Sequence, residues 1–170
     1  KNMNEQKAKY YFQCNDCCKH YQPDQVEYLC PACNNQHKND EPPKGVLRTL
    51  YDYESLKNHG QSLQELKNSG YIDLLPLSSL DHWPNLRIGN TPLYKVDAPG
   101  EEDGFELFLK DDSQNPSFSF KDRASALVSA FAKANKIDTI VTASTGNAGS
   151  SISAICANQQ QKAIVLVPAS

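Results

Sequence analysis

The 170-residue sequence has no run of eighteen apolar residues, the length that a membrane-spanning helix needs. Its first residues, Lys1 to Lys9, contain no apolar stretch that could act as a secretory signal, so we expect a cytoplasmic protein. An excess of basic residues is also lacking. The net charge is -3 and the pI is about 5.8, which argues against a general nucleic-acid-binding surface. Only 39% of the residues are hydrophobic, and the polar N-terminal third accounts for this low value.

Two CxxC pairs are the first notable feature, and the sequence shows no other internal repeat. Cys14 and Cys17 are followed, after twelve residues, by Cys30 and Cys33. This is the arrangement of a zinc ribbon, in which four thiolates hold one tetrahedral metal ion. Two disulfides are the alternative, which a cytosolic protein disfavours. A module this small has too little core to fold without help, so the metal would provide its stability.

The choice of ligands in this cluster is open at one position. Cys18 is an extra thiol that could replace Cys17 and form a CxxxC pair with Cys14. His20 and His37 are spare ligands nearby, which we interpret as solvated polar residues. The predicted metal ligands are Cys14, Cys17, Cys30 and Cys33.

A polar linker follows the cysteines from residue 34 to residue 44 and ends close to two prolines. Residues 46–51 alternate well enough for a strand, and residues 53–69 indicate a helix that Gly60 interrupts. The predicted inward side chains of this helix are Leu56, Leu63 and Leu66. The motif IGNTPL at residues 88–93 then precedes the strands of the C-terminal part.

The stretch NPSFSFKDR at residues 115–123 lies between a short apolar run, predicted as a strand at residues 105–109, and an amphipathic segment. Ser119 is predicted as the N-cap of the helix that follows, with Asp122 three residues later as in a capping box. Lys121 then lies in the first turn, where the positive end of the helix dipole favours the neutral amine that Schiff-base chemistry needs. A lysine alone would more often be an exposed residue of a surface helix.

The helix after this lysine has an apolar face, judged by the spacing of its apolar residues. The residues of that face are Phe120, Ala124, Leu127, Val128 and Phe131. Lys121 lies about 100° from Phe120 around the helix, so the lysine could face a cleft while Phe120 packs.

A second signal is the run TASTGNAG at residues 142–149, which directly follows the apolar residues 137–141. A strand, a small polar loop and a helix start, in this order, leave the first N–H groups of the helix free, and two hydroxyls add to them. We therefore predict an anion-binding loop. An ordinary turn between a strand and a helix is the alternative.

Taken together, NPSFSFKDR and ASTGNAGSS resemble the motifs of the fold-type II pyridoxal-phosphate (PLP) enzymes, and most closely those of the threonine synthases. The resemblance implies that Lys121 holds the cofactor as a Schiff base and that Asn147 binds its 3′-hydroxyl. It further implies that Ser144 and Thr145 bind the substrate carboxylate. Many relatives have glycine where this chain has Phe118, a departure within the loop beside the substrate.

The predicted fold class is α/β, because strands at residues 139–142 and 163–167 alternate with a helix at residues 147–158. The continuous apolar run 163–167 is typical of a parallel strand covered on both faces. Cys156 is predicted to be a buried structural thiol. The resemblance implies part of a tryptophan synthase β-like domain with a small N-terminal zinc ribbon. The predicted division is a ribbon at 1–40, a linker with a strand and helix at 41–95, and the N-terminal part of the catalytic domain at 96–170.

The resemblance implies that the complete enzyme converts O-phospho-L-homoserine and water to L-threonine and phosphate. The 170 residues contain no counterpart of the glycine-rich loop that grips the cofactor phosphate, nor of the hydroxyl residue opposite the pyridine nitrogen. We therefore expect the chain to be the N-terminal part of such an enzyme, inactive alone. The family also suggests a homodimer, and we expect no membrane or nucleic-acid partner.

Two rival classes of protein stay open. One is another fold-type II enzyme, such as a serine/threonine dehydratase or a cysteate synthase. Ala148 and Gly149 favour a threonine synthase, because dehydratases tend to have histidine directly after Asn147. The other rival is a non-enzymatic zinc-ribbon protein with a vestigial catalytic half, against which the intact Lys121 and Asn147 argue.

Overall fold

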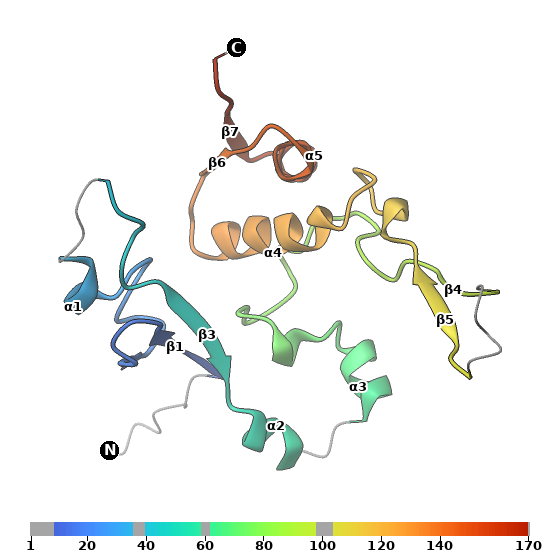
Figure 1. Cartoon of the computed structure of the whole chain (residues 1–170), viewed down its shortest axis with the longest axis horizontal. Coiled ribbons are helices and arrows are strands. Elements are labelled where there is room, and N and C mark those ends of the chain that lie inside the picture. Colours follow the sequence, from blue (N-terminus) through green and yellow to red (C-terminus); the bar gives the residue numbers. More distant parts are fainter. Residues whose placement is uncertain (1–8, 36–39, 59–61, 98–103, 170) are drawn as a thin grey trace. The chain divides into compact units, whose positions relative to one another are not determined.

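The structure of the chain is a computed structural model that describes residues 9–35, 40–58, 62–97 and 104–169 (Figure 1). The chain divides into two compact units, one formed by Lys1–Pro76 and the other by Leu77–Ser170. Among the described residues, none of the helices combines the length and the apolar character that crossing a bilayer requires.

The first unit is built on a small antiparallel sheet with the strand order β2-β1-β3. Its strands are β1 (Tyr10–Cys14), β2 (His20–Tyr21) and β3 (Leu47–Tyr51). Tyr10 and Phe12 are two residues apart on β1, so their side chains lie on the same face of the sheet. Their rings meet edge to face, with centroids 5.7 Å apart. The strand predicted at residues 46–51 is therefore confirmed, and it pairs along the whole length of β1.

Short helices make up the rest of the first unit. They are α1 (Pro31–Asn34), α2 (Tyr53–Asn58), α3 (Leu63–Asn68) and the 3-10 helix η1 (Ile72–Leu74). The helix predicted at residues 53–69 is interrupted, as expected, although Gly60 itself lies outside the described residues. Ser62 and Glu65 form a capping box, so α3 starts anew, and Leu63 at its first position is exposed rather than inward.

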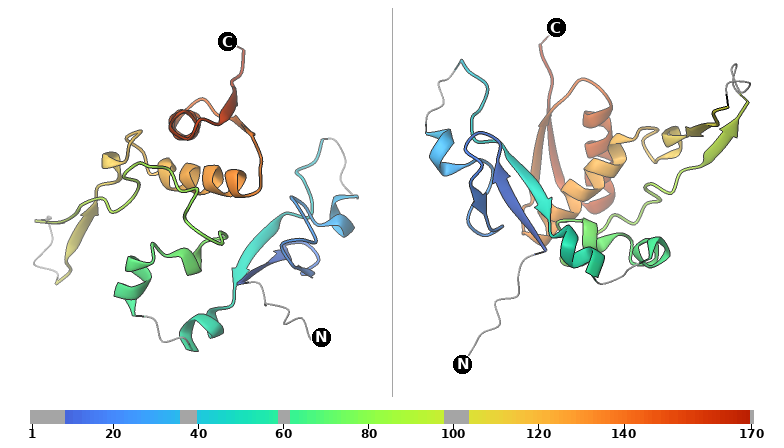
Figure 2. Two further views of the ribbon diagram at one scale, coloured as in Figure 1. Left: turned by 180° about the vertical axis from the view of Figure 1, so that it is seen from behind. Right: turned by 60° about the horizontal axis from the view of Figure 1, so that its bottom comes forward.

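The second unit alternates strands and helices, which confirms the α/β class. Its elements are β4 (Leu93–Val96), β5 (Leu107–Lys110), the 3-10 helix η3 (Asp112–Gln114), α4 (Lys121–Ala134), β6 (Thr139–Ala143), α5 (Asn147–Gln159) and β7 (Lys162–Leu166). β4 and β5 are antiparallel, whereas β6 and β7 are parallel and joined through α5. Figure 2 shows this strand–helix–strand unit from two further sides.

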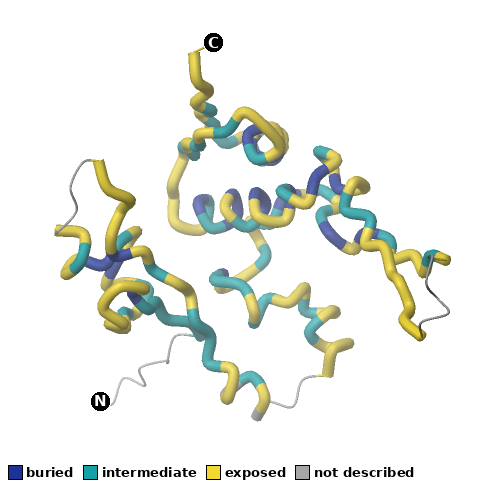
Figure 3. The backbone as a smooth tube through the Cα atoms, viewed as in Figure 1, coloured by how far each residue is buried: buried dark blue, intermediate teal, exposed yellow. Residues whose placement is uncertain are grey.

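The core of the second unit lies between α4 and α5 (Figure 3). As predicted, α5 buries Ile152, Ile155 and Cys156. The face of α4 that is buried consists of small or polar residues, namely Asp122, Ser125, Ala126, Ser129, Ala130 and Ala132. The predicted apolar face of α4 was wrong, since its members are exposed or only half-buried: Phe120, Ala124, Leu127, Val128 and Phe131. Small side chains let the two helices approach closely and leave the larger apolar residues outside.

The strand β7 confirms one part of its prediction and contradicts another. It pairs in parallel with β6, from Thr139 opposite Lys162 to Ala143 opposite Leu166. Its apolar side chains are not covered on both faces by the described residues, because Ile164 and Leu166 are exposed. The sequence therefore identified the strand but not its surroundings.

Candidate functional site

Lys121 is the first residue of α4 and follows a polar loop. Phe120 occupies the N-cap position without a side-chain hydrogen bond, so the predicted N-cap at Ser119 was wrong by one residue. Ser119 Oγ instead accepts a hydrogen bond from the N–H of Lys121 at 3.2 Å. Phe120 is 58% exposed and does not pack as predicted; the Nζ atom of Lys121 lies 4.8 Å from the centroid of its ring. Within the described part of the chain, no ion pair or hydrogen bond engages this amine.

Asp122 is buried, with 0% of its surface exposed, and joins α4 to α5. Its carboxylate accepts hydrogen bonds from the N–H of Ser117 at 2.7 Å, from the Ser117 hydroxyl, and from the Ser151 hydroxyl at 2.6 Å. Ser151 Oγ also lies 2.7 Å from Ser125 Oγ. Because a hydroxyl has one proton, Ser151 donates to the carboxylate and accepts from Ser125. These bonds occupy Asp122, which explains why it does not complete the predicted capping box.

The hydrogen bond between Asp122 and Ser151 brings the first turns of α4 and α5 together. Asn147 begins α5 and lies about one helical turn, roughly 6 Å, before Ser151 on the same face. Lys121 directly precedes Asp122. The two residues expected to bind the cofactor thus belong to neighbouring helix starts, and the side chain of Asn147 is exposed.

The loop before α5 has donors that are free to bind a ligand. Ser144 Oγ accepts hydrogen bonds from the N–H groups of Gly146 at 3.2 Å and Gly149 at 3.0 Å. Its own proton makes only a long contact of 3.4 Å with the Gly146 carbonyl. Among the described residues, the N–H groups of Thr145, Asn147 and Ala148 have no partner. The loop thus presents two hydroxyl protons and three N–H groups, as an anion site requires.

Gly149 lets α5 sit close to its own loop and to β7. A Cβ atom at this position would lie 3.1 Å from the Ser144 carbonyl oxygen and 3.1 Å from Val165 Cγ1. A larger residue would therefore push the loop away from the helix start and disturb the free N–H groups.

Arg123 and Lys110 are both engaged within the protein. The Arg123 guanidinium binds both oxygens of Asp112, at 2.9 and 2.8 Å, and lies 3.3 Å from Thr91 Oγ1. This hydrogen-bonded ion pair holds the pKa of Asp112 well below its usual range. The Lys110 amine donates to the Thr91 carbonyl. Both cations therefore fix the GNTPL motif to the segment before α4, where Gly89 N–H also donates to the buried Asn115 side chain at 2.8 Å.

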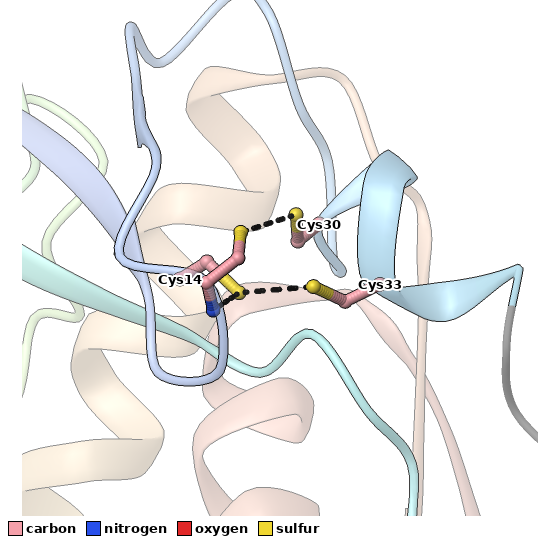
Figure 4. A group of neighbouring side chains, drawn as sticks. Cys14, Cys30 and Cys33 are labelled. Atoms are coloured by element: carbon pink, nitrogen blue, oxygen red, sulfur yellow. Dashed lines mark hydrogen bonds between the residues drawn. The ribbon is translucent and has the colours of Figure 1, made fainter.

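The second candidate site is a cluster of four cysteines in the first unit, of which Figure 4 labels Cys14, Cys30 and Cys33. The Sγ atoms of Cys14, Cys17, Cys30 and Cys33 all lie within 4.8 Å of one another. The Cys17–Cys30 separation is 3.7 Å and the Cys14–Cys33 separation is 3.9 Å. Four sulfurs at a Zn–S distance of about 2.3 Å form a tetrahedron whose edges are about 3.8 Å. A disulfide requires sulfurs about 2.05 Å apart, so the observed spacing fits a metal and not two disulfides.

The structure places Cys17 in this cluster and leaves Cys18 outside it. Cys18 follows directly with a left-handed backbone, at a φ of 59°, and its side chain is exposed. The N–H groups of Asp16 and Cys17 reach Cys14 Sγ at 3.4 and 3.5 Å. The second CxxC lies at the start of α1, where the N–H groups of Ala32 and Cys33 donate hydrogen bonds to the sulfur of Cys30. At Cys30, these N–H donors favour the thiolate form of the sulfur.

Tyr21 adds a side-chain hydroxyl to the cysteine cluster. Its hydroxyl oxygen lies 3.0 Å from Cys30 Sγ. Chiefly through this hydrogen bond, the pKa of Cys30 is lowered to about 6 and the pKa of Tyr21 is raised to about 12. The pKa of Cys33 is raised to about 12, chiefly because its thiol is hydrogen-bonded to Cys17. One sulfur of the cluster is therefore ready to bind a cation as a thiolate.

Gly45 is a residue of this site that the sequence reasoning missed. Its carbonyl accepts the Cys30 N–H at 2.8 Å, and its own N–H donates to Asp16 at 2.6 Å. Its φ is +83°, and an added Cβ would lie 3.0 Å from Cys30 Cβ. The sequence contains one signal for this role, a glycine directly before the strand predicted at residues 46–51. The predicted linker ended at Lys44, so Gly45 was assigned to neither element.

Comparison with known proteins identifies the family of the second unit. The profile of a family described as "Pyridoxal-phosphate dependent enzyme" matches residues 85–170, about half of the chain. The chain belongs to this family. The amine of Lys121, which has no ion pair or hydrogen bond among the described residues, can react with an aldehyde. The exposed amide of Asn147 can bind a ring hydroxyl, so the residues present fit PLP.

Individual relatives cover different parts of the chain. A threonine synthase of Methanocaldococcus jannaschii is 32% identical over 91% of this chain, and one of Methanosarcina acetivorans is 32% identical over 94% of it. Cysteine synthase B of Escherichia coli is 35% identical over 48% of the chain. The chain spans 37% of the length of each of the two threonine synthases.

Proposed function

We propose that the whole protein is a threonine synthase, which converts O-phospho-L-homoserine and water to L-threonine and phosphate. The observation that carries this proposal is the extent of the similarity. Two threonine synthases match over more than nine tenths of the chain, whereas the match to cysteine synthase B covers 48%. The activity is proposed for the whole protein, since the chain covers 37% of these relatives.

In the proposed reaction, Lys121 holds the cofactor and carries protons. PLP, when bound, withdraws electrons from the α-carbon of the amino acid attached to it. Once the substrate amine has replaced Lys121 on the cofactor, the lysine amine would take the proton from the α-carbon and then one from the β-carbon, so that the γ-phosphate can leave. It would return protons to the γ-carbon and, after water has added at the β-carbon, to the α-carbon. Its position at the first residue of α4, with no ion-pair partner among the described residues, leaves it free for both tasks. Asn147, at the neighbouring helix start, would orient the cofactor ring by a hydrogen bond to the hydroxyl group of that ring.

Ser144 and Thr145 are proposed to bind the substrate carboxylate. Ser144 Oγ accepts hydrogen bonds from two backbone N–H groups, which fix the position of the oxygen. The proton of this hydroxyl has only a long contact with a carbonyl, so it can be donated to a ligand. Thr145 is exposed, and its N–H group is one of the three that lack a partner in the described part of the chain. Two hydroxyl protons and the positive end of α5 suit a carboxylate.

The γ-phosphate of the substrate needs further donors. A buried dianion is costly unless it is paired. Lys110 and Arg123, two cations that flank the loop at residues 115–119 in the sequence, are engaged with the Thr91 carbonyl and with Asp112. In the loop at residues 115–119, Asn115 and Ser117 also use their donors within the chain. We therefore propose that most of the phosphate donors come from the rest of the whole protein.

The test uses the full-length protein with PLP. We expect release of inorganic phosphate from O-phosphohomoserine together with formation of threonine. Borohydride reduction and peptide mapping should place the cofactor on Lys121. Ketobutyrate formation from threonine, without turnover of phosphohomoserine, would make the protein a dehydratase. Cysteine formation from O-acetylserine and sulfide alone would make it a cysteine synthase, and labelling of a different lysine would remove Lys121 from its role.

We further propose that Cys14, Cys17, Cys30 and Cys33 bind one structural zinc ion. The spacing of their sulfur atoms supports this proposal, since it matches the edges of a tetrahedral site. Zinc content of Cys17→Ser and Cys18→Ser variants provides the test. Loss of zinc only in Cys17→Ser is expected, because Cys18 lies outside the cluster. Loss only in Cys18→Ser would make the ligand assignment wrong.

A further inference from the structure

Tyr21 is the residue on β2 whose hydroxyl reaches the cysteine cluster. Its hydroxyl lies 3.0 Å from Cys30 Sγ, and Cys30 is 0% exposed. No other side-chain hydroxyl of the described residues contacts a sulfur of the four cysteines. Cys30 therefore differs from Cys14, whose sulfur accepts hydrogen bonds from backbone N–H groups and has no hydroxyl donor among the described residues.

The direction of this hydrogen bond follows from the chemistry of the ligand. A cysteine that binds zinc is a thiolate and has no proton to give, so the phenol must donate to the sulfur. Four thiolates around one divalent cation leave a net charge of -2, and the sulfurs of Cys14 and Cys30 are removed from water. Such a charge needs hydrogen-bond donors.

The sheet fixes the position of this donor. Tyr21 pairs with Phe12 in the β1–β2 hairpin, and the neighbouring pair is Gln13 with His20. Gln13 Nε2 lies 2.7 Å from His20 Nε2, which ties the two strands together beside Tyr21. The hydroxyl is therefore held against the sulfur by the strand pairing.

We propose that Tyr21 is an outer-shell hydrogen-bond donor that holds Cys30 on the zinc ion and lowers the reactivity of its sulfur. The inference rests on the metal site proposed above. Donation from a phenol withdraws electron density from the thiolate, so the sulfur becomes a weaker nucleophile toward electrophiles. It also stabilises the charged cluster, as outer-shell partners of metal sites commonly do.

Tyr21→Phe in the full-length protein is the test, with Tyr28→Phe as the matched control. Tyr28 belongs to the same unit, is 77% exposed and makes no hydrogen bond through its hydroxyl in the described part of the chain. Zinc affinity, measured by competition with a chelator, should fall roughly 10- to 100-fold in Tyr21→Phe and stay unchanged in Tyr28→Phe. Zinc release by N-ethylmaleimide should be faster in Tyr21→Phe alone.

Cobalt(II) provides a readout that does not depend on affinity. The sulfur-to-cobalt charge-transfer band should move to longer wavelength in Tyr21→Phe, because the sulfur has lost its donor. Replacing Tyr21 with 3,5-difluorotyrosine keeps the shape of the side chain and strengthens the donor, so zinc release should then be slower than in the wild type.

The outcomes separate the two proposals. Wild-type protein that binds no zinc after reconstitution would overturn the metal site. Wild-type protein that binds zinc, with Tyr21→Phe unchanged in affinity, alkylation rate and cobalt spectrum, would overturn the role of Tyr21 alone. Equal losses in Tyr21→Phe and Tyr28→Phe would also overturn it, since the effect would then be general.

Discussion

The two units hold their interiors together in different ways. Among the described residues of the first unit, the buried non-glycine side chains are Cys14, Val26 and Cys30. The second unit buries an aliphatic cluster around Ile155 and a network of hydroxyls around Asp122. A unit whose interior consists largely of sulfur cannot rely on hydrophobic burial alone. We therefore expect the first unit to depend on the proposed metal ion and the second on helix packing.

Removal of the proposed metal ion should have the largest effect, and it should affect the first unit but not the second. A structural zinc ion contributes on the order of 10 kcal/mol to a small domain, so chelation should unfold the β1–β2–β3 sheet. The α4–α5 pair contains none of the four cysteines and should stay folded. Amide hydrogen exchange of the full-length protein, with and without chelator, measures both regions at once. Protection that persists in β1 after complete metal removal would contradict the proposed dependence.

Asp122→Asn should weaken the second unit. The substitution removes the charge that accepts hydrogen bonds from Ser117 and Ser151, and hydrogen bonds to charged groups contribute about 1.5–3 kcal/mol. We expect the free energy of unfolding of this unit to fall by about 2–3 kcal/mol, measured by urea titration. Asp138→Asn is the control, because that exposed carboxylate has no described hydrogen bond and should change stability by less than about 0.5 kcal/mol. Equal effects of the two substitutions would show that the helix pair does not depend on Asp122.

Gly45→Ala should weaken the first unit through the backbone. Alanine at a left-handed φ costs about 1–2 kcal/mol, and its Cβ would also press against Cys30. Gly104→Ala separates the two contributions, since Gly104 has a φ of +82° with nothing within 4 Å of an added Cβ. We expect a loss of about 2 kcal/mol at Gly45 and about 1 kcal/mol at Gly104. Zinc affinity should fall only for Gly45→Ala, and unchanged affinity would show that Cys30 tolerates the contact.

Phe118→Gly should give the smallest effect, and in the opposite direction. Phe118 has a φ of 59° and is 81% exposed, so it is strained without much packing among the described residues. Glycine relieves the strain but loses more entropy on folding, so we expect a net gain of about 0.5–1 kcal/mol in urea unfolding. Destabilisation of the full-length protein would instead indicate that the ring packs against another part of it.

Several features followed from the sequence because they are local. The parallel strands around α5 were predicted from apolar runs and a helical spacing, and β6 and β7 confirm them. The buried Cys156 was predicted from its place on the apolar face of α5. The double CxxC pattern indicated a four-cysteine cluster, since two short spacings suffice to pair sulfurs. Each of these signals depends on residues that are close in the sequence.

Other features were decided by contacts between segments far apart in the sequence. The apolar stripe of α4 was expected to face inward, but α4 packs on α5 through Ser125, Ala126 and Ser129, because small residues allow close approach. Asp122 was expected to cap its own helix, but a buried carboxylate takes the strongest donors within reach, and these include Ser151, 29 residues away. The sequence by itself therefore determined the family, the helix–strand–helix–strand order from Lys121 onward and the cysteine cluster. Only the tertiary structure decided which face of α4 is buried and that Arg123 binds Asp112. It also decided that Cys17 rather than Cys18 joins the cluster. Burial and hydrogen bonding depend on which segments meet in space, and this is not a local property of the sequence.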